Sequence, residues 1–171
     1  MIYYIADTHF GHEAILRHDQ RPFSSMEDMD RALMENWNRV VGPEDDVYIL
    51  GDFCYRSAKA PASYLKQLHG HKHLIRGNHD GGALKDAHFT EQLESVDKLL
   101  FLRDQGRNVV LCHFPLAEWN GFYRGAYHLY GHIHTRRDSA AWAYMAGQPR
   151  AFNVGCMLHN YTPVTLDQLI G

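Results

Sequence analysis

The sequence predicts an α/β fold in which helices are layered on mixed β-sheet. Short apolar segments rich in β-branched or aromatic residues recur along the chain, as expected of buried strands. In the first half they alternate with helix-like segments, whereas the second half is richer in strands. The chain has 171 residues, enough for a substantial core, and contains no repeat, linker or low-complexity segment. It is therefore expected to form one domain, residues 1–171.

Strands are expected at the six most apolar short segments, which are residues 2–6, 47–50, 73–76, 108–112, 127–130 and 152–154. A hairpin is expected over residues 96–112, because two strand-like stretches flank the turn formed by Gln105 and Gly106.

Three helices are expected. The first lies between the first two strands, where apolar residues recur at helical spacing: Met26, Met29, Leu33, Trp37 and Val40. Ser24 and Glu27 have the spacing of a capping box at its start, and Gly42 followed by Pro43 would end it. A second helix is expected over 60–69. A third is expected to begin at Thr165, which has capping-box spacing to Gln168.

The composition is that of an ordinary globular protein and narrows the functional classes. Hydrophobic residues make up 45% and charged residues 22% of the chain. The formal net charge of −3 argues against a protein that binds nucleic acid regardless of sequence. No apolar run is long enough to span a membrane, and Met1 leads directly into a strand-like segment, so a cytoplasmic location without membrane partners is expected.

Polar residues of a restricted kind follow five of the expected strands. The polar side chains there are almost entirely carboxylates, imidazoles and one carboxamide, in the blocks Asp7-Thr8-His9 with His12 nearby, Gly51-Asp52, Gly77-Asn78-His79-Asp80, His113, and Gly131-His132-Ile133-His134. Each block alone is more often an ordinary turn or a surface histidine. The whole set indicates a ligand site, because α/β folds bind ligands at the carboxyl ends of their strands.

The donor types suit a pair of divalent transition metals. Imidazole and carboxylate without thiolate favour Mn, Fe, Zn, Co or Ni. Two ions a few ångströms apart need a bridging ligand, and a carboxylate can supply it. Gly51, Gly77 and Gly131 beside the blocks would permit sharp turns and a close approach of the backbone.

The five blocks, in this order, resemble the motif pattern of the calcineurin-like metallophosphoesterase superfamily. The matching blocks span residues 7 to 134, and the chain length is similar to that of the small single-domain phosphoesterases of bacteria, archaea and phages. The resemblance implies a layered sandwich of two mixed β-sheets flanked by helices. It also implies hydrolysis of a phosphoester by a hydroxide bridging two metal ions.

The resemblance also assigns roles to residues. The first metal would be bound by Asp7, His9 and His134, with Asp52 bridging to a second metal bound by Asn78, His113 and His132. His79 would not bind metal but would face the substrate as general acid or transition-state stabiliser. Asp80 could orient the ring of His79, as carboxylates often orient imidazoles.

One segment is longer than is usual in the superfamily, since 45 residues separate Asp7 from Asp52. The additional residues, 13–25, could form a surface insertion or could face the substrate. Arg17 and Arg21 could then bind phosphate, and His12 lies close to the metal loop. Most of the aromatic residues Trp119, Phe122 and Tyr123 are expected to pack in the core, with stacking on a nucleotide base as the alternative.

The expected substrate is a small phosphoester or nucleotide-like molecule, with phosphodiesters favoured because no capping domain is evident. A phosphomonoesterase would use the same site. A non-catalytic scaffold of the same fold is a weaker alternative, because all the expected ligands and His79 are present. A di-iron redox protein is disfavoured, because its usual host is a helical bundle with Glu-x-x-His motifs.

Overall fold

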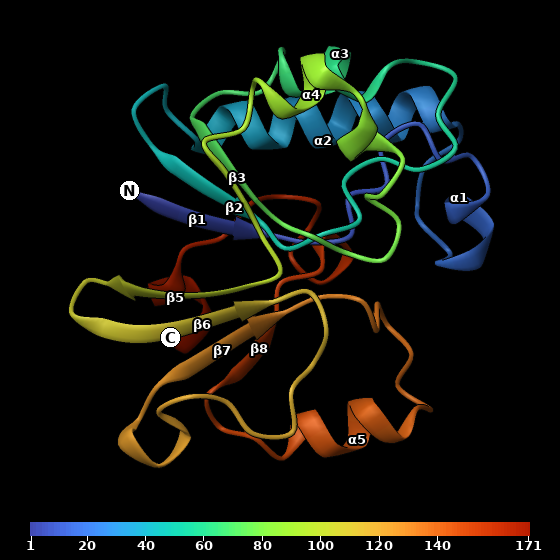
Figure 1. Ribbon diagram of the computed structural model, residues 1–171. Helices are drawn as coiled ribbons and strands as arrows, with labels where there is room; N and C mark the ends of the chain where they lie inside the picture. Colours follow the sequence, from blue (N-terminus) through green and yellow to red (C-terminus); the bar gives the residue numbers. More distant parts are fainter.

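The computed structural model describes residues 1–171, which form two four-stranded sheets packed face to face (Figure 1). The first sheet contains, in spatial order, β1 (Ile2–Ile5), β2 (Asp46–Ile49), β3 (His71–Ile75) and β4 (Ser95–Asp97). The second contains β5 (Leu99–Asp104), β6 (Arg107–Cys112), β7 (Tyr127–Tyr130) and β8 (Ala151–Asn153). The predicted α/β sandwich is therefore the observed architecture.

The two sheets differ in strand direction. All neighbouring strands in the first sheet are parallel, whereas a mixed sheet was expected. The second sheet is mixed, because β5 and β6 form the predicted antiparallel hairpin while β7 and β8 join in parallel. The hairpin begins later than predicted. Val96 and Asp97 belong to β4 of the first sheet, and the chain passes between the sheets at Lys98.

Alternation along the strands builds two apolar layers. On β1, Tyr3 and Ile5 belong to the cluster between the first sheet and the helices, whereas Tyr4 and Ala6, the residue after β1, belong to the cluster between the sheets. Successive side chains of a strand point to opposite faces, so a fully apolar strand can serve both layers. The layer between the sheets fixes how the carboxyl ends of their strands face one another.

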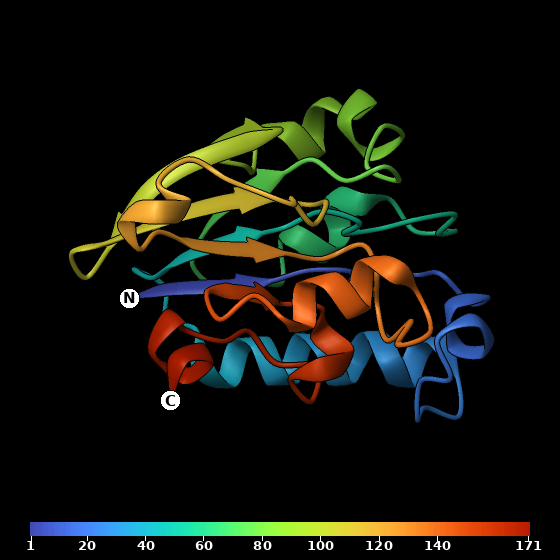
Figure 2. The ribbon, with the colours of Figure 1, turned by 90° about the horizontal axis from the view of Figure 1, so that it is seen from below.

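Helices cover the outer faces of the sandwich (Figures 1 and 2). The long α2 (Met26–Val40) lies on the first sheet near α3 (Pro61–Leu65) and α4 (Ala87–Thr90), and α5 (Ala140–Ala146) lies on the second. The chain also forms α1 (Ile15–His18), α6 (Leu166–Ile170) and three 3₁₀ turns, η1 (Ala83–Lys85), η2 (Phe122–Arg124) and η3 (Cys156–Leu158).

The helix ends refine the sequence predictions. The N-cap of α2 is Ser25, whose side chain accepts from the backbone N–H of Asp28, so the capping box predicted at Ser24 and Glu27 is wrong by one residue. The helix predicted over 60–69 is shorter, and α1, α4 and α5 were not predicted. The capping box of Thr165 and Gln168 is confirmed. None of the helices combines the length and the apolar character that crossing a membrane requires.

Candidate metal centre

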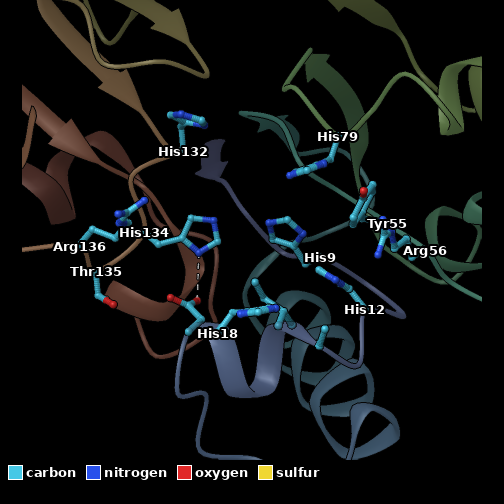
Figure 3. A pocket seen from close by; sticks show the side chains of 13 residues that line it. His9, His12, His18, Tyr55, Arg56, His79, His132, His134, Thr135 and Arg136 are labelled. Atoms are coloured by element: carbon cyan, nitrogen blue, oxygen red, sulfur yellow. Dashed lines mark ion pairs between the residues drawn. The ribbon is translucent and has the colours of Figure 1, made fainter. Parts of the chain in front are cut away.

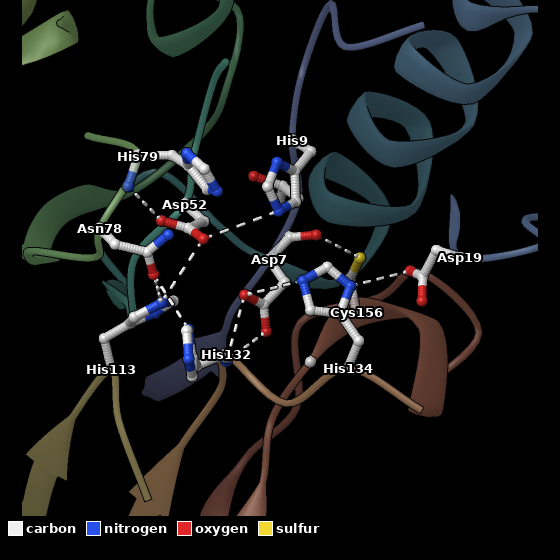
Figure 4. Close-up of polar contacts among 12 residues, drawn as sticks. Asp7, His9, Asp19, Asp52, Asn78, His79, His113, His132, His134 and Cys156 are labelled. Atoms are coloured by element: carbon white, nitrogen blue, oxygen red, sulfur yellow. Dashed lines mark hydrogen bonds and ion pairs between the residues drawn. The ribbon is translucent and has the colours of Figure 1, made fainter. Parts of the chain in front are cut away.

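The carboxyl ends of the strands meet where the two sheets face each other, and the expected ligands converge there (Figure 4). Two groups of three side chains place one donor atom each within 4.8 Å of one another. The first group is Asp7, His9 and His134, and the second is Asp52, His113 and His132. Each group takes residues from both sheets, so neither exists until the sheets have packed together.

Asp52 lies between the two groups. Its Oδ2 atom is 3.8 Å from Nε2 of His9 in the first group and 3.5 Å from Nε2 of His113 in the second. Its other oxygen, Oδ1, accepts a 2.8 Å hydrogen bond from the backbone N–H of His79. One carboxylate oxygen is therefore held by the backbone while the other faces both donor groups.

Asn78 completes the second group. Its Oδ1 atom lies 3.1 Å from Nε2 of His113 and 2.9 Å from Nδ1 of His132. A carboxamide oxygen between two imidazole nitrogens is arranged like a ligand atom around a shared centre. The structure thus brings together all seven side chains that the sequence predicted as metal ligands.

The imidazoles are oriented through their other nitrogens. Nδ1 of His113 lies 2.7 Å from the carbonyl oxygen of Leu50, so an Nδ1–H donating there leaves Nε2 as a lone-pair donor. Nδ1 of His134 lies 3.2 Å from a carboxylate oxygen of Asp19, whose side chain is buried. Partners of this kind fix the ring orientation of histidines that bind metals.

Buried donor atoms without protein partners support the same interpretation. Both ring nitrogens of His9 are buried and have no hydrogen-bond partner. Buried polar atoms are normally satisfied, and exceptions call for an explanation such as an ion. The residues present therefore fit a metal site in both donor chemistry and arrangement.

The charges of the cluster depend strongly on burial. Burial raises the pKa of Asp7 to about 6, against the lowering effect of His134. For Asp52 burial also raises the pKa, but His113, the backbone N–H of His79 and the imidazole of His9 together outweigh burial and hold the pKa at about 2. Burial keeps the pKa of His9 well below its ordinary value. Two buried carboxylates beside a neutral imidazole favour a cation among them, and its binding would displace protons.

The backbone of the ligands is unusual. Five of the seven have positive φ, with values of 56° for Asp7, 52° for His9, 54° for Asp52, 68° for His132 and 46° for His134. Few non-glycine residues adopt this left-handed conformation, and such outliers concentrate at functional sites because the surrounding structure must hold them there. The strand ends are thus turned sharply so that neighbouring side chains point to a common centre.

Two glycines allow the strand ends to approach the ligands. A Cβ atom on Gly77 would lie 2.4 Å from Oδ1 and 2.7 Å from the backbone nitrogen of Asp52. A Cβ atom on Gly131 would lie 2.7 Å from Oδ2 of Asp7. The expectation that glycine is needed beside the ligands therefore has a direct steric reason at these two positions.

Replacing Gly77 with alanine should destabilise the protein. The added methyl group must displace Asp52, and overpacking of this kind costs about 1–3 kcal/mol of unfolding free energy. Gly82→Ala is the matched control, since a Cβ atom there meets nothing within 4 Å. Chemical denaturation of both variants in the presence of a chelator measures the difference. Equal stability of the two variants would contradict the close approach at Gly77.

Asp80 does not orient the ring of His79, and that prediction is corrected. Its carboxylate is fully buried and accepts from the backbone N–H groups of Asp52, Phe53 and Gly77, at 2.9, 2.9 and 2.6 Å. Three backbone donors occupy the carboxylate, so it ties the loop after β2 to the loop after β3. The ring of His79 instead packs against Tyr55, with 4.1 Å between ring centroids.

Arg21 also lies elsewhere than expected. It is 5% exposed, and its guanidinium donates to the carbonyl oxygens of Asp7 and Thr8 and to the carboxylate of Asp19. These contacts place it beneath the metal loop, so a direct contact with substrate phosphate is not what the structure provides. Arg17 is exposed and does not line the pocket, whereas His12 does.

An open pocket of about 560 Å³ lies over the first group of donors (Figure 3). Besides His9, His12, His79, His132 and His134, its lining includes residues that sequence reasoning missed: His18, Tyr55, Arg56, Thr135 and Arg136. Their position in the sequence could have revealed them, since most lie within a few residues after a ligand block.

The three aromatic residues 119, 122 and 123 do not reach this pocket. Trp119 and Phe122 pack with Val110 beneath the second sheet, as expected of core residues. Tyr123 does not, because it is 83% exposed. None of the three forms a stacking platform beside the metal ligands.

Comparison with known proteins decides the family. A family model described as calcineurin-like phosphoesterase matches residues 1–113. The chain belongs to the calcineurin-like phosphoesterase family. The matched region contains four of the five ligand blocks, and the fifth, Gly131 to His134, follows it in the same site.

Relatives of this phosphoesterase occur in an archaeon and in a phage, and a structure of similar fold comes from a bacterium. An uncharacterized protein of Methanocaldococcus jannaschii is 33% identical, over 99% of this chain and 89% of that protein. The Gene 66 protein of Mycobacterium phage D29 is 30% identical, over 90% of this chain and 86% of that protein. A protein of unknown function from Aquifex aeolicus has a crystal structure with a TM-score of 0.78 and 24% identity, covering 98% of this chain and 96% of that one. This last likeness confirms the fold.

The family assignment gives the site its general chemistry. The chain is a metal-dependent phosphoesterase, a hydrolase acting on ester bonds. The structure has two candidate ligand clusters of aspartate and histidine for such a metal. The predicted family and enzyme class are thus confirmed.

Proposed function

We propose that this phosphoesterase hydrolyses phosphodiesters with two divalent metal ions and with His79 as general acid. The supporting observation is the position of Asp52, whose Oδ2 atom faces His9 of one donor group and His113 of the other at 3.8 and 3.5 Å. A single carboxylate oxygen between two sets of donors is the geometry that a bridging ligand requires. Nitrogen and oxygen donors without sulfur favour Mn, Fe, Zn, Ni or Co.

When bound, the metals would lower the pKa of a water molecule and neutralise charge on the phosphoryl oxygens. The other steps belong to the chain itself. His79 is half-buried and lines the pocket, with its backbone N–H fixed by Asp52. Its imidazolium would give a proton to the leaving oxygen as the bond to phosphorus breaks, while the attacking water leaves its hydroxyl on phosphorus and returns a proton to the site.

The positions of two arginines in the pocket support a diester over a monoester. Cationic side chains lie on both sides of the metal ligands, Arg56 near His79 and Arg136 near His134 (Figure 3). A monoester has an organic group on only one side of phosphorus, whereas a diester can extend both ways. A phosphomonoesterase is the alternative that uses the same ligands. A scaffold without catalysis is disfavoured, because no expected ligand is missing.

Assays of the metal-free and metal-loaded enzyme test this proposal. Enzyme stripped with a chelator and checked by elemental analysis should be inactive, and Mn, Fe, Zn, Ni or Co should restore activity. Bis(4-nitrophenyl) phosphate should be cleaved faster than 4-nitrophenyl phosphate. Full activity without metal would overturn the metal mechanism. Faster cleavage of the monoester would overturn the diester preference and support the monoesterase.

A further inference from the structure

A second hollow adjoins the pocket over the metal ligands. It has a volume of about 290 Å³ and shares Tyr55, Arg56 and His79 with that pocket. Its remaining lining comes from the loop between β2 and α3, including Ser57 and Lys59, and from Gly82 and Ala83 after the His79 loop. This volume suits a group the size of one aromatic or sugar ring with a substituent.

His79 stands at the border between the two spaces. A general acid must lie within hydrogen-bond reach of the oxygen that departs. The leaving group attached to that oxygen therefore lies on the side of His79 away from the metal ligands. Figure 3 shows Tyr55 and Arg56 on this side, with His132 and His134 on the other. The second hollow is the space that opens there.

The charge of the hollow is one-sided. Arg56 and Lys59 are exposed, neither pairs with a carboxylate, and no acidic residue lines the hollow. Each cation lies near an aromatic ring, since the guanidinium carbon of Arg56 lies 5.2 Å from the ring centre of Tyr55 and Nζ of Lys59 lies 6.0 Å from that of Tyr64. Two unpaired cations beside a ring-sized space would attract an anionic group there.

We infer that this hollow is the leaving-group site and that the natural leaving group carries a phosphate or a carboxylate. The inference rests on the proposed diester hydrolysis with His79 as acid, because that role defines the departing side. It narrows the substrate class to diesters whose released alcohol is itself anionic, such as a phosphorylated alcohol. Lys59 is then a specificity-determining residue, since it lines only this hollow and not the pocket over the metals.

Two diesters whose leaving groups differ by one anionic substituent test the inference. Methyl phenyl phosphate releases phenol, and methyl 3-phosphonophenyl phosphate releases a phenol that carries a phosphonate. The carbon–phosphorus bond of the phosphonate is not hydrolysed. The metal-loaded enzyme should prefer the phosphonate ester by about fivefold in kcat/KM, the size expected of partly exposed charge pairs. Added salt should reduce this preference because it screens exposed charges.

Three variants locate the effect. Lys59→Gln should reduce the preference toward one, and Lys59→Arg should keep it because the positive charge remains. Lys66→Gln makes the same charge change at an exposed position at the end of α3 that lines neither space, and should keep the preference. Hydrolysis of both esters with no preference, or a preference unchanged in Lys59→Gln, would overturn the leaving-group site but leave the proposed function standing. Hydrolysis of neither ester would overturn both.

Discussion

Asp52→Asn should lower kcat/KM by more than about 100-fold. Removing a residue that only supports a metal ligand typically lowers activity by up to about that factor, and a ligand shared by two metals should matter more. Oδ2 of Asp52 faces both donor groups while Oδ1 is held by the backbone N–H of His79. An amide keeps the size of the side chain but loses the negative charge. It also replaces one of the two oxygens with an NH₂ group that cannot bind a metal. The variant should therefore retain fewer than two metal ions per chain, as measured by elemental analysis after gel filtration.

Asp46→Asn is the matched control for Asp52→Asn. Asp46 begins β2, the strand that precedes Asp52, at the end away from the metal ligands, and its side chain is 45% exposed. This variant should keep its metals and its rate. A variant Asp52→Asn with two metals per chain and a near-normal rate would show that the carboxylate does not bridge.

His79→Ala should keep its metals but lose activity unevenly among substrates. General-acid catalysis contributes about 10²–10⁴-fold, and it matters most when the leaving alcohol is a weak acid. The loss should therefore approach this range for diesters with alkyl leaving groups and be much smaller for nitrophenyl diesters. The measurement is the dependence of kcat/KM on leaving-group pKa, which should be steeper in the variant than in the native enzyme.

His88→Ala provides the comparison for His79→Ala, because the side chain of His88 is 86% exposed and lies on α4, outside the pocket. It should leave the dependence on leaving group unchanged. Equal losses on good and poor leaving groups in His79→Ala, or a missing metal, would argue against the acid role. The first outcome would leave His79 as a residue that only stabilises charge or packing.

The sequence predicted which side chains gather at this site because carboxylates, imidazoles and one carboxamide follow the strands locally in the chain. Asp7, Asp52 and His113 lie within three residues of the ends of apolar strands, and parallel strands bring their carboxyl ends to one edge. The short apolar segments located most strands to within two residues. It did not separate Val96 and Asp97 from the hairpin, because strand character alone does not tell which sheet a segment joins.

The supporting residues were not predictable because their roles depend on tertiary contacts. Asp80 follows His79 in the chain, yet its carboxylate points back to three backbone N–H groups. Arg21 lies in a segment expected to be a surface insertion or to face the substrate, but it is buried against the carbonyl oxygens of the metal loop. Neither sequence spacing nor residue type reveals the direction in which such a side chain turns.

The contact between the two sheets at the metal ligands has a consequence for the order in which the protein folds. The backbone N–H of His132 donates at 2.9 Å to the carboxylate of Asp7, across 125 residues of chain. Contacts this distant in sequence carry a large loop-closure cost and form slowly. The metal centre is therefore expected to close late, after each sheet has gathered its own strands. A metal that binds only when the two sheets are packed together would then stabilise the packed form. It would add about 2.7 kcal/mol of stability when its concentration is 100 times its dissociation constant.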